Sequence, residues 1–203
     1  MTSRMDPPEP TTSAYPAHLE VDVTLRDGST VRVRPVREGD LAAVRELFEG
    51  LSQRSLAFRF FTGAVPAEAI ERLARVTDPA DECHLVAARG KPERLVGHAM
   101  YSRTGPERAE VAFVVADELQ GYGLGTILLA HLAEIASEHG ITTFEAEVMP
   151  ENHRMIEVFR DSGFPVESSS RPGRIHIELP TALTPEARER FHRRETLASA
   201  AAV

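Results

Sequence analysis

The chain has 203 residues, 42% hydrophobic and 27% charged, which is ordinary for a globular protein long enough to bury a core. Its formal net charge of -8 argues against a general nucleic-acid-binding function, which needs a basic surface, and suits cationic partners such as amines. A single cysteine, Cys83, excludes an internal disulfide and favours a reducing, cytoplasmic setting, and no apolar run reaches the roughly 20 residues that span a membrane.

We expect the chain to begin with a disordered tail and to continue as one folded domain. Residues 1–16 are rich in Pro, Ser and Thr and nearly free of aliphatic side chains. Apolar and polar residues then alternate, and Asp27-Gly28 separates two alternating runs, which predicts a β-hairpin. Asp40 directly precedes the helical pattern LAAVRELFEG and is predicted to be its N-cap. The folded domain is expected to cover residues 17–182, with a helix and tail over 183–203.

The segment between this helix and the central strands is predicted to hold two more helices. LSQRSLAFRFFTG favours a short helix with a dense aromatic patch, and a second helix is predicted over 66–76, where Pro66 suits the first turn. Two strands are predicted over 84–89 and 94–103, joined by a turn at 90–93. Cys83 lies just before the first of them; we expect a small buried thiol, and an acyl-carrying role is the alternative.

The most informative stretch covers residues 109–139. Apolar side chains alternate over 111–115 with the period of a strand, glycines follow at 121, 123 and 125, and a helical period begins after Thr126. A strand that enters a helix through a glycine-rich loop leaves unpaired backbone N–H groups at the positive end of the helix dipole. Such a loop favours a phosphate ligand.

The spacing of these glycines excludes two phosphate-binding motifs. The loop has no Gly-Lys-Ser/Thr, so it is not a nucleoside-triphosphate P-loop. The dinucleotide motif GxGxxG also fails, because its third glycine would fall on Thr126 or Leu128. What is present reads Gln120-x-x-Gly123-x-Gly125. A plain turn that happens to hold three glycines is the alternative interpretation.

The second half of the chain continues the alternation of strands and helices. ITTFEAEVMP predicts a second central strand, and HRMIEVFRDSGF predicts a helix that ends at Gly163. Strands over 166–169 and 174–179 are predicted to form a closing hairpin. An amphipathic helix is predicted over 185–197.

Several of these segments together resemble the GNAT N-acetyltransferases over roughly residues 19–180. The similar features are Arg34-Pro35-Val36-Arg37 followed by Asp40, the loop Gln120-x-x-Gly123-x-Gly125, and Asn152 followed by a helix and Ser162-Gly163-Phe164. Phe-Arg-Phe-Phe at 58–61 is most similar to the acetyltransferase domains of bacterial protein-lysine acetyltransferases. The resemblance implies an α/β fold with a mixed, mostly antiparallel sheet, splayed central strands and helices on both faces. It also implies that the aromatic helix forms a wall of the acceptor cleft, although plain core packing of Phe58, Phe60 and Phe61 is the simpler interpretation.

The resemblance implies acetyl-CoA as cosubstrate, and no metal. The pantetheine arm would lie along the first central strand at Phe113, Val114 and Val115 and would face Asn152, for which a helix N-cap is the other interpretation. The pyrophosphate would be bound by the amides of Gln120, Gly121, Tyr122, Gly123, Leu124, Gly125 and Thr126.

Acetyl transfer to an amine requires the neutral amine, because an ammonium group has no lone pair. A lysine with a pKa of about 10.4 is neutral about once in 2,500 molecules at pH 7, a deficit of roughly 4.6 kcal/mol. A carboxylate base offsets part of this deficit. The resemblance places that base at Glu110, and a solvated strand-edge glutamate is the alternative interpretation. Glu147 is the second candidate base, and Glu145 and Glu147 are predicted to attract a cationic acceptor.

The function that the resemblance implies is direct transfer of an acetyl group from acetyl-CoA to a primary amine in a ternary complex. A protein lysine, for example on an acyl-CoA synthetase, is the expected acceptor, ahead of a small-molecule amine. Phe159 departs from the family, since many members have at this position a tyrosine that protonates the leaving thiolate. This departure motivates a second hypothesis, a non-catalytic acyl-CoA-sensing module. A different acyl group and a homodimer stay open.

Overall fold

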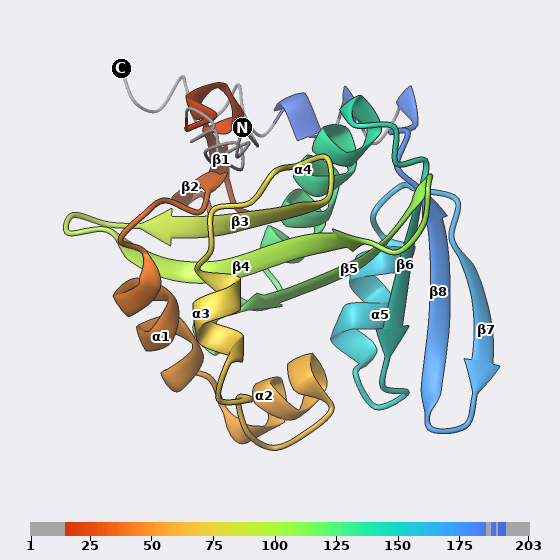
Figure 1. Ribbon diagram of the computed structural model, residues 1–203, viewed down its shortest axis with the longest axis horizontal. Helices are drawn as coiled ribbons and strands as arrows, with labels where there is room; N and C mark the ends of the chain where they lie inside the picture. The colour runs from red at the N-terminus through yellow and green to blue at the C-terminus, as the bar shows by residue number, and fades with distance from the viewer. Residues whose placement is uncertain (1–14, 186–187, 190, 194–203) are drawn as a thin grey trace, which may run out of the picture.

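The computed structural model describes residues 15–185, 188–189 and 191–193 (Figure 1). Its centre is an eight-stranded sheet in the order β1-β2-β3-β4-β5-β6-β8-β7, in which β5 and β6 form the one parallel pair of neighbours. The strands are β1 (Val21–Thr24), β2 (Thr30–Pro35), β3 (Glu82–Arg89), β4 (Arg94–Arg103), β5 (Arg108–Val115), β6 (Thr143–Val148), β7 (Glu167–Arg171) and β8 (Arg174–Pro180). The helices are α1 (Leu41–Glu49), α2 (Gln53–Phe60), α3 (Ala69–Leu73), α4 (Leu124–Glu138) and α5 (His153–Arg160), with short 3-10 helices at Ala17–Leu19 and Asp117–Leu119.

Local sequence signals located most of these elements. The Asp27-Gly28 hairpin is confirmed, with Gly28 at φ +82°, and the bounds of β4 and of the turn at 90–93 are as predicted. The helix expected over 66–76 is shorter, because Pro66 opens a turn whose carbonyl accepts from the Ala69 N–H, so the helix begins only at Ala69. Neither 3-10 helix was expected from the sequence.

Helices cover both faces of the sheet, as expected (Figure 1). A Cβ on Gly97 of β4 would lie 3.3 Å from Leu128 Cδ1 and 3.4 Å from Leu124 Cδ2, so the absence of a side chain lets α4 approach this face closely. His98 points to the opposite face, where its ring lies 5.9 Å from that of Phe48 on α1. Residues that pair across neighbouring strands share a face, so Glu110, paired with Ser102, lies on the face of α1 and α2.

The two central strands separate after a short parallel contact. β5 and β6 pair only from Arg108 opposite Thr143 to Glu110 opposite Glu145. Beyond this point β5 stays paired with β4 as far as Val115, and β6 stays paired with β8 as far as Val148. Each strand therefore keeps its outer neighbour while the inner pair diverges, which Figure 1 shows as an open wedge between β5 and β6.

The expected tails fall largely outside the described residues. Of the predicted disordered tail over 1–16, only Tyr15 and Pro16 are described, and the Tyr15 hydroxyl donates to Glu20 at 2.8 Å. Of the helix predicted over 185–197, residues 185, 188–189 and 191–193 are helical, and Phe191 is buried against His131 of α4. No helix among the described residues is both long and apolar enough to cross a membrane.

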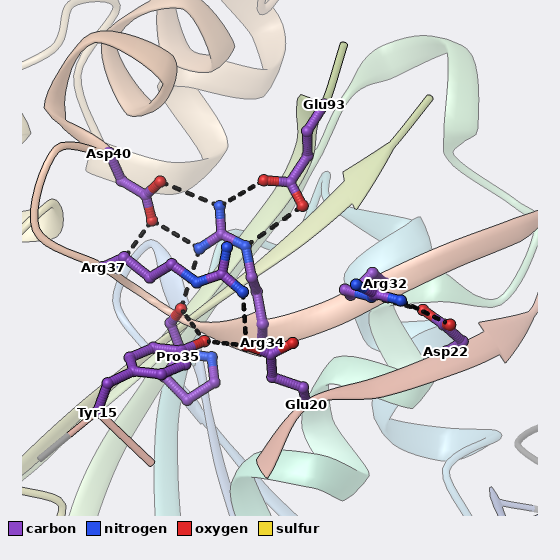
Figure 2. Close-up of polar contacts among 9 residues, drawn as sticks. All are labelled: Tyr15, Glu20, Asp22, Arg32, Arg34, Pro35, Arg37, Asp40 and Glu93. Atoms are coloured by element: carbon purple, nitrogen blue, oxygen red, sulfur yellow. Dashed lines mark hydrogen bonds and ion pairs between the residues drawn. The ribbon is translucent and has the colours of Figure 1, made fainter. Parts of the chain in front are cut away.

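Asp40 does not cap α1, contrary to the sequence prediction. Its carboxylate instead accepts two hydrogen bonds from Arg34, at 2.7 and 3.0 Å, and one from the Arg37 N–H (Figure 2). Arg34 is only 1% exposed, and its guanidinium also donates to Glu93 and to the Pro35 carbonyl. The need to neutralise this buried cation outweighs the weaker gain from a helix cap.

We expect Asp40→Asn to lower the free energy of unfolding by about 2–3 kcal/mol, because it removes one of the two carboxylates that neutralise buried Arg34. The control is Asp22→Asn. Asp22 pairs with Arg32 (Figure 2), and both side chains are more than a third exposed, so the loss should stay below about 1 kcal/mol. Urea denaturation at pH 7 measures both variants. Equal losses would show that Arg34 does not depend on Asp40.

We also expect the stability lost in Asp40→Asn to depend on pH. Burial opposes ionisation of Asp40, but hydrogen bonds from Arg34 and from the Arg37 amide hold the pKa of this carboxyl below its usual range. A carboxyl with a lowered folded-state pKa stabilises the fold above its unfolded pKa of about 3.9 and loses that contribution as the pH falls through the folded value. The stability difference between wild type and Asp40→Asn should therefore be full at pH 6 and shrink below about pH 4. A difference that is constant from pH 6 to pH 3 would contradict this.

Candidate functional site

A cleft of about 590 Å³ opens where β5 and β6 separate. Most of its lining comes from four parts of the chain: β5 from Glu110 onward, the loop that enters α4, the end of β6 with α5, and α2. Arg26 of the turn between β1 and β2 also lines it. If β5 and β6 stayed hydrogen-bonded along their whole length, no space would remain between them. Their divergence therefore creates the cleft.

The loop that enters α4 has the backbone of an anion-binding site. Gly121 and Gly123 adopt left-handed φ values of +88° and +87°, which other residues adopt only with strain. No side chain caps α4 at Gly123, and the first helical amide bond runs from Ile127 to the Gly123 carbonyl at 3.3 Å. The N–H groups of residues 124–126 therefore precede the hydrogen-bonded helix, and these residues line the cleft. The positive end of the helix dipole favours an anion there.

Gly125 has a second role, in packing. A Cβ at this position would lie 3.2 Å from Val158 of α5 and 3.4 Å from the Phe113 ring of β5. Glycine therefore lets α4 meet both elements at the base of the loop. The Phe113 ring also contacts that of Phe159, with centroids 5.8 Å apart.

A hydrogen-bond network joins the glycine loop to α2. Asp117 accepts from the Ser52 amide at 2.9 Å and from the Ser55 hydroxyl at 2.7 Å, and these bonds hold the pKa of its carboxyl below the usual range although burial opposes this. Gln120 donates to the Val115 carbonyl at 3.1 Å and to Ser55 at 3.2 Å. The loop and α2, which form two different walls of the cleft, are thereby held in a defined relative position.

The structure brings nearly all the residues predicted to bind the cosubstrate into this one cleft. Asn152 lines it and also caps α5, where its side chain accepts from the Met155 amide, so the two interpretations of this residue are compatible. Tyr122 is the exception, since it does not line the cleft and is 39% exposed, while its carbonyl accepts from the Arg26 amide. The lining residues from the predicted set are Phe113, Val114, Val115, Gln120, Gly121, Gly123, Leu124, Gly125, Thr126 and Asn152.

The three predicted carboxylates lie on the same face of the sheet but in different surroundings. Glu110 lies where β5 and β6 part, lines the cleft and is exposed to solvent. Glu147 also lines the cleft, and its Oε1 contacts His176 at 2.8 Å and accepts from Arg171 at 3.1 Å. Glu145 does not line the cleft, and its carboxylate accepts from Arg108 at 2.6 Å.

The α2 wall supplies aromatic and cationic side chains to the cleft. Phe58 and Phe61 line it, whereas Phe60 packs against the core with its ring 5.6 Å from Phe48. Phe61 adopts a left-handed φ of +58°, and the Arg174 guanidinium of β8 lies 4.1 Å from its ring centroid. This contact links the C-terminal end of α2 to the closing hairpin.

Several residues that line the cleft carried no sequence signal of function. They come from segments far apart in the chain and converge only in the folded protein. They include Arg26, Arg54, Ser55, Arg59, Asp117, Arg154 and Glu157.

Two groups outside the cleft bear on the expected chemistry. Cys83 is buried, and burial raises the pKa of its thiol to about 12, so the thiol stays protonated at neutral pH and is a poor nucleophile.

Glu145, His176 and Glu178 place possible metal-ligand atoms within 4.8 Å of one another. Both carboxylates of this group form ion pairs with Arg108, which supplies a positive charge in place of a cation.

The mixed sheet with its parted central strands and the glycine loop at a helix start define the class of fold, and comparison with known proteins gives the family. The chain belongs to the acetyltransferase (GNAT) family, whose model matches residues 51–164. The resemblance to this family and the expected fold are both confirmed.

Individual relatives point in the same direction. The GNAT domain of PAT from S. lividans has 37% sequence identity and a TM-score of 0.75, covering 82% of this chain and 99% of that one. The acetyltransferase Pat of Mycolicibacterium smegmatis is 30% identical over 140 residues, 68% of this chain. The chain spans 42% of the length of that relative. An acetyltransferase of Pseudomonas aeruginosa is 29% identical over 146 residues, 70% of this chain and 78% of the relative.

Proposed function

We propose that this protein transfers the acetyl group of acetyl-CoA to a primary amine, with the ε-amine of a protein lysine as acceptor. One observation carries the proposal: β5 and β6 diverge beyond Glu110 and Glu145, and the resulting cleft runs to the glycine loop at the start of α4. In this proposal the loop binds the pyrophosphate, and the pantetheine arm occupies the gap, paired with the free edge of β5 at Phe113–Val115. Asn152 faces the arm from the other side of the gap.

The acceptor amine would enter on the α2 face, where Glu110 can act as the base. The amine must lose a proton to attack the thioester carbonyl, and Glu110 is the solvent-accessible carboxylate at the point where the strands part. Glu147 would attract the cationic side chain before deprotonation. The two carboxylates that β5 and β6 present on this face, Glu110 and Glu147, favour a cationic lysine over a neutral acceptor.

The leaving thiolate has no tyrosine to protonate it. Phe159 is buried against Phe113 and offers no hydroxyl. We infer that water or the proton released by the amine protonates CoA in this enzyme.

The similarity to PAT GNAT domains supports a protein as the acceptor. An acyl-CoA synthetase is the first acceptor to test. The protein should be incubated with acetyl-CoA and purified acyl-CoA synthetases, and acetyl-lysine should be mapped by mass spectrometry beside a panel of small amines. Enzyme-dependent acetylation of one or a few lysines is the expected result. Acetylation of a small amine with no protein lysine modified would overturn the choice of acceptor.

A further inference from the structure

Arg59 is a cation in the cleft wall that pairs with no carboxylate among the residues that the structure describes. It belongs to α2 and lines the cleft. Its Nε is shielded from solvent and has no hydrogen-bond acceptor among the described residues. Its Nη2 lies 3.4 Å from the Met100 thioether sulfur, a weak acceptor. A guanidinium carries five N–H donors, and the described residues take up few of those of Arg59.

Arg59 is only partly exposed, and the fully buried Arg34 shows what a shielded guanidinium requires in this fold. Arg34 donates to two carboxylates and to a backbone carbonyl, as Figure 2 shows. Arg59 has no carboxylate within ion-pair distance in the described part of the chain, and its guanidinium lies 5.0 Å from the Phe60 ring. Buried charges in proteins are normally paired. Arg59, whose Nε is shielded from solvent, has no such partner in the described part of the chain, and this contrast points to a ligand in the cleft as its partner.

Arg59 retains its charge at neutral pH. Burial and repulsion by Arg72, partly offset by attraction to Glu110, lower the pKa of the Arg59 guanidinium to about 10. The group is therefore cationic when the cleft is empty. Part of the guanidinium of Arg59 is shielded from water, and an anionic ligand would supply hydrogen bonds in place of that water. The attraction between the two charges would be stronger here than at the open surface.

Arg59 lies too far from the glycine loop for its anionic ligand to be the CoA pyrophosphate. Met100, which Arg59 contacts, is paired with Ala112 of β5, two residues from Glu110. From Ala112 to Val115 the strand rises by about 10 Å, and the glycine loop lies farther on. Arg59 therefore lies at the reacting end of the cleft, where the acyl group and the acceptor meet.

We propose that Arg59 forms a carboxylate-binding subsite at the reacting end of the cleft, for a carboxylate carried by the acyl group or by the acceptor. The first source is a dicarboxylic acyl-CoA, such as succinyl-CoA, and the second is an amino acid that presents its α-amine. A guanidinium matches the planar geometry of a carboxylate through two parallel hydrogen bonds. A single negative charge fits better than a phosphate dianion, because Glu110 and Glu147 also line the cleft.

The transfer step is the same for either source. The amine nitrogen attacks the thioester carbonyl carbon, the new C–N bond forms, and the C–S bond breaks with its electron pair on sulfur. The amine proton passes to the base, and the thiolate takes a proton from water. The carboxylate on Arg59 is unchanged throughout and only orients its carrier. The inference rests on the proposed binding of acyl-CoA in the cleft, but not on a protein lysine as acceptor.

The test compares two matched ligand pairs on the full chain. The first pair is succinyl-CoA and acetyl-CoA, compared by calorimetry and by kcat/KM with an uncharged amine acceptor. The second is an amino acid and its decarboxylated amine, both acetylated from acetyl-CoA. We expect wild type to favour the carboxylate-bearing member of one pair. Arg59→Met should lower that preference about tenfold to a hundredfold, the effect of a lost charged hydrogen bond.

Two further variants serve as controls for this result. Arg59→Lys keeps the charge but not the two-pronged geometry, so it should retain part of the preference, and it serves as the test if Arg59→Met does not fold. Arg54→Met is the matched control, because Arg54 also belongs to α2, lines the cleft and lies over a phenylalanine ring, but is exposed. Its preference ratios should equal those of wild type.

The outcomes separate the two sources and the two proposals. Loss of preference in the first pair assigns the carboxylate to the acyl group, and loss in the second assigns it to the acceptor. If wild type shows no preference in either pair, or if Arg59→Met lowers both members of each pair equally, the subsite is overturned while acetyl transfer stands. If no CoA thioester binds to the wild-type chain, the proposed function itself fails.

Discussion

Glu110→Gln is expected to lower kcat for acetyl transfer to lysine by at least about tenfold at pH 7, with the Kd for acetyl-CoA nearly unchanged. Glutamine keeps the size of the side chain but cannot accept the proton that the attacking amine must lose. The cosubstrate is held elsewhere in the proposed complex, on the glycine loop and the edge of β5, so its affinity should not depend on this carboxylate. Steady-state kinetics with a lysine acceptor and calorimetry with acetyl-CoA measure the two quantities separately.

Glu107→Gln is the control for this variant. Glu107 lies just before β5, is exposed and does not line the cleft, so the same chemical change there should leave kcat as in wild type. If Glu110→Gln turns over as fast as wild type, Glu110 is not the base. Glu147→Gln would then be the next variant, because Glu147 is the other predicted carboxylate that lines the cleft.

Gly121→Ala should raise the Kd for acetyl-CoA by about tenfold or more, the effect of losing one charged hydrogen bond. Gly121 has φ of +88°, and nothing lies within 4 Å of an added Cβ, so the cost comes from backbone strain and not from a collision inside the protein. Relief of that strain, roughly 1–2 kcal/mol, would rotate the neighbouring peptide units and move their N–H groups out of line with the pyrophosphate. Calorimetric titration with acetyl-CoA measures the effect.

Gly140→Ala provides a matched control at the other end of α4. Gly140 has φ of +75° and equally open surroundings, but it follows the C-terminal end of the helix. This variant should lose a similar amount of stability, measured by thermal unfolding, without a change in Kd. If the two variants weakened acetyl-CoA binding equally, the effect would reflect general destabilisation, and the glycine loop would lose its assigned role.

Sequence patterns located the elements well where short-range chemistry controls them. The Asp27-Gly28 turn, the strand at 111–115 and the glycine loop depend on backbone preferences of a few adjacent residues, and all three were found where predicted. Asp40 shows the limit of such reasoning. Its position favoured a helix cap, but Arg34 from the neighbouring strand and Glu93 from a distant turn made it a partner of a buried cation.

In the candidate site, too, some features were predictable from the sequence and others depended on the tertiary structure. Residues 113–126 form a strand, a glycine turn and a helix start, so their order along the chain was enough to predict a phosphate-binding loop and, by resemblance, the family. The separation of β5 from β6, the link from Asp117 to α2, and the contact of Arg59 with Met100 arise between segments tens of residues apart. Local propensity carries no information on such contacts, because they depend on which surfaces the packed sheet and helices bring together.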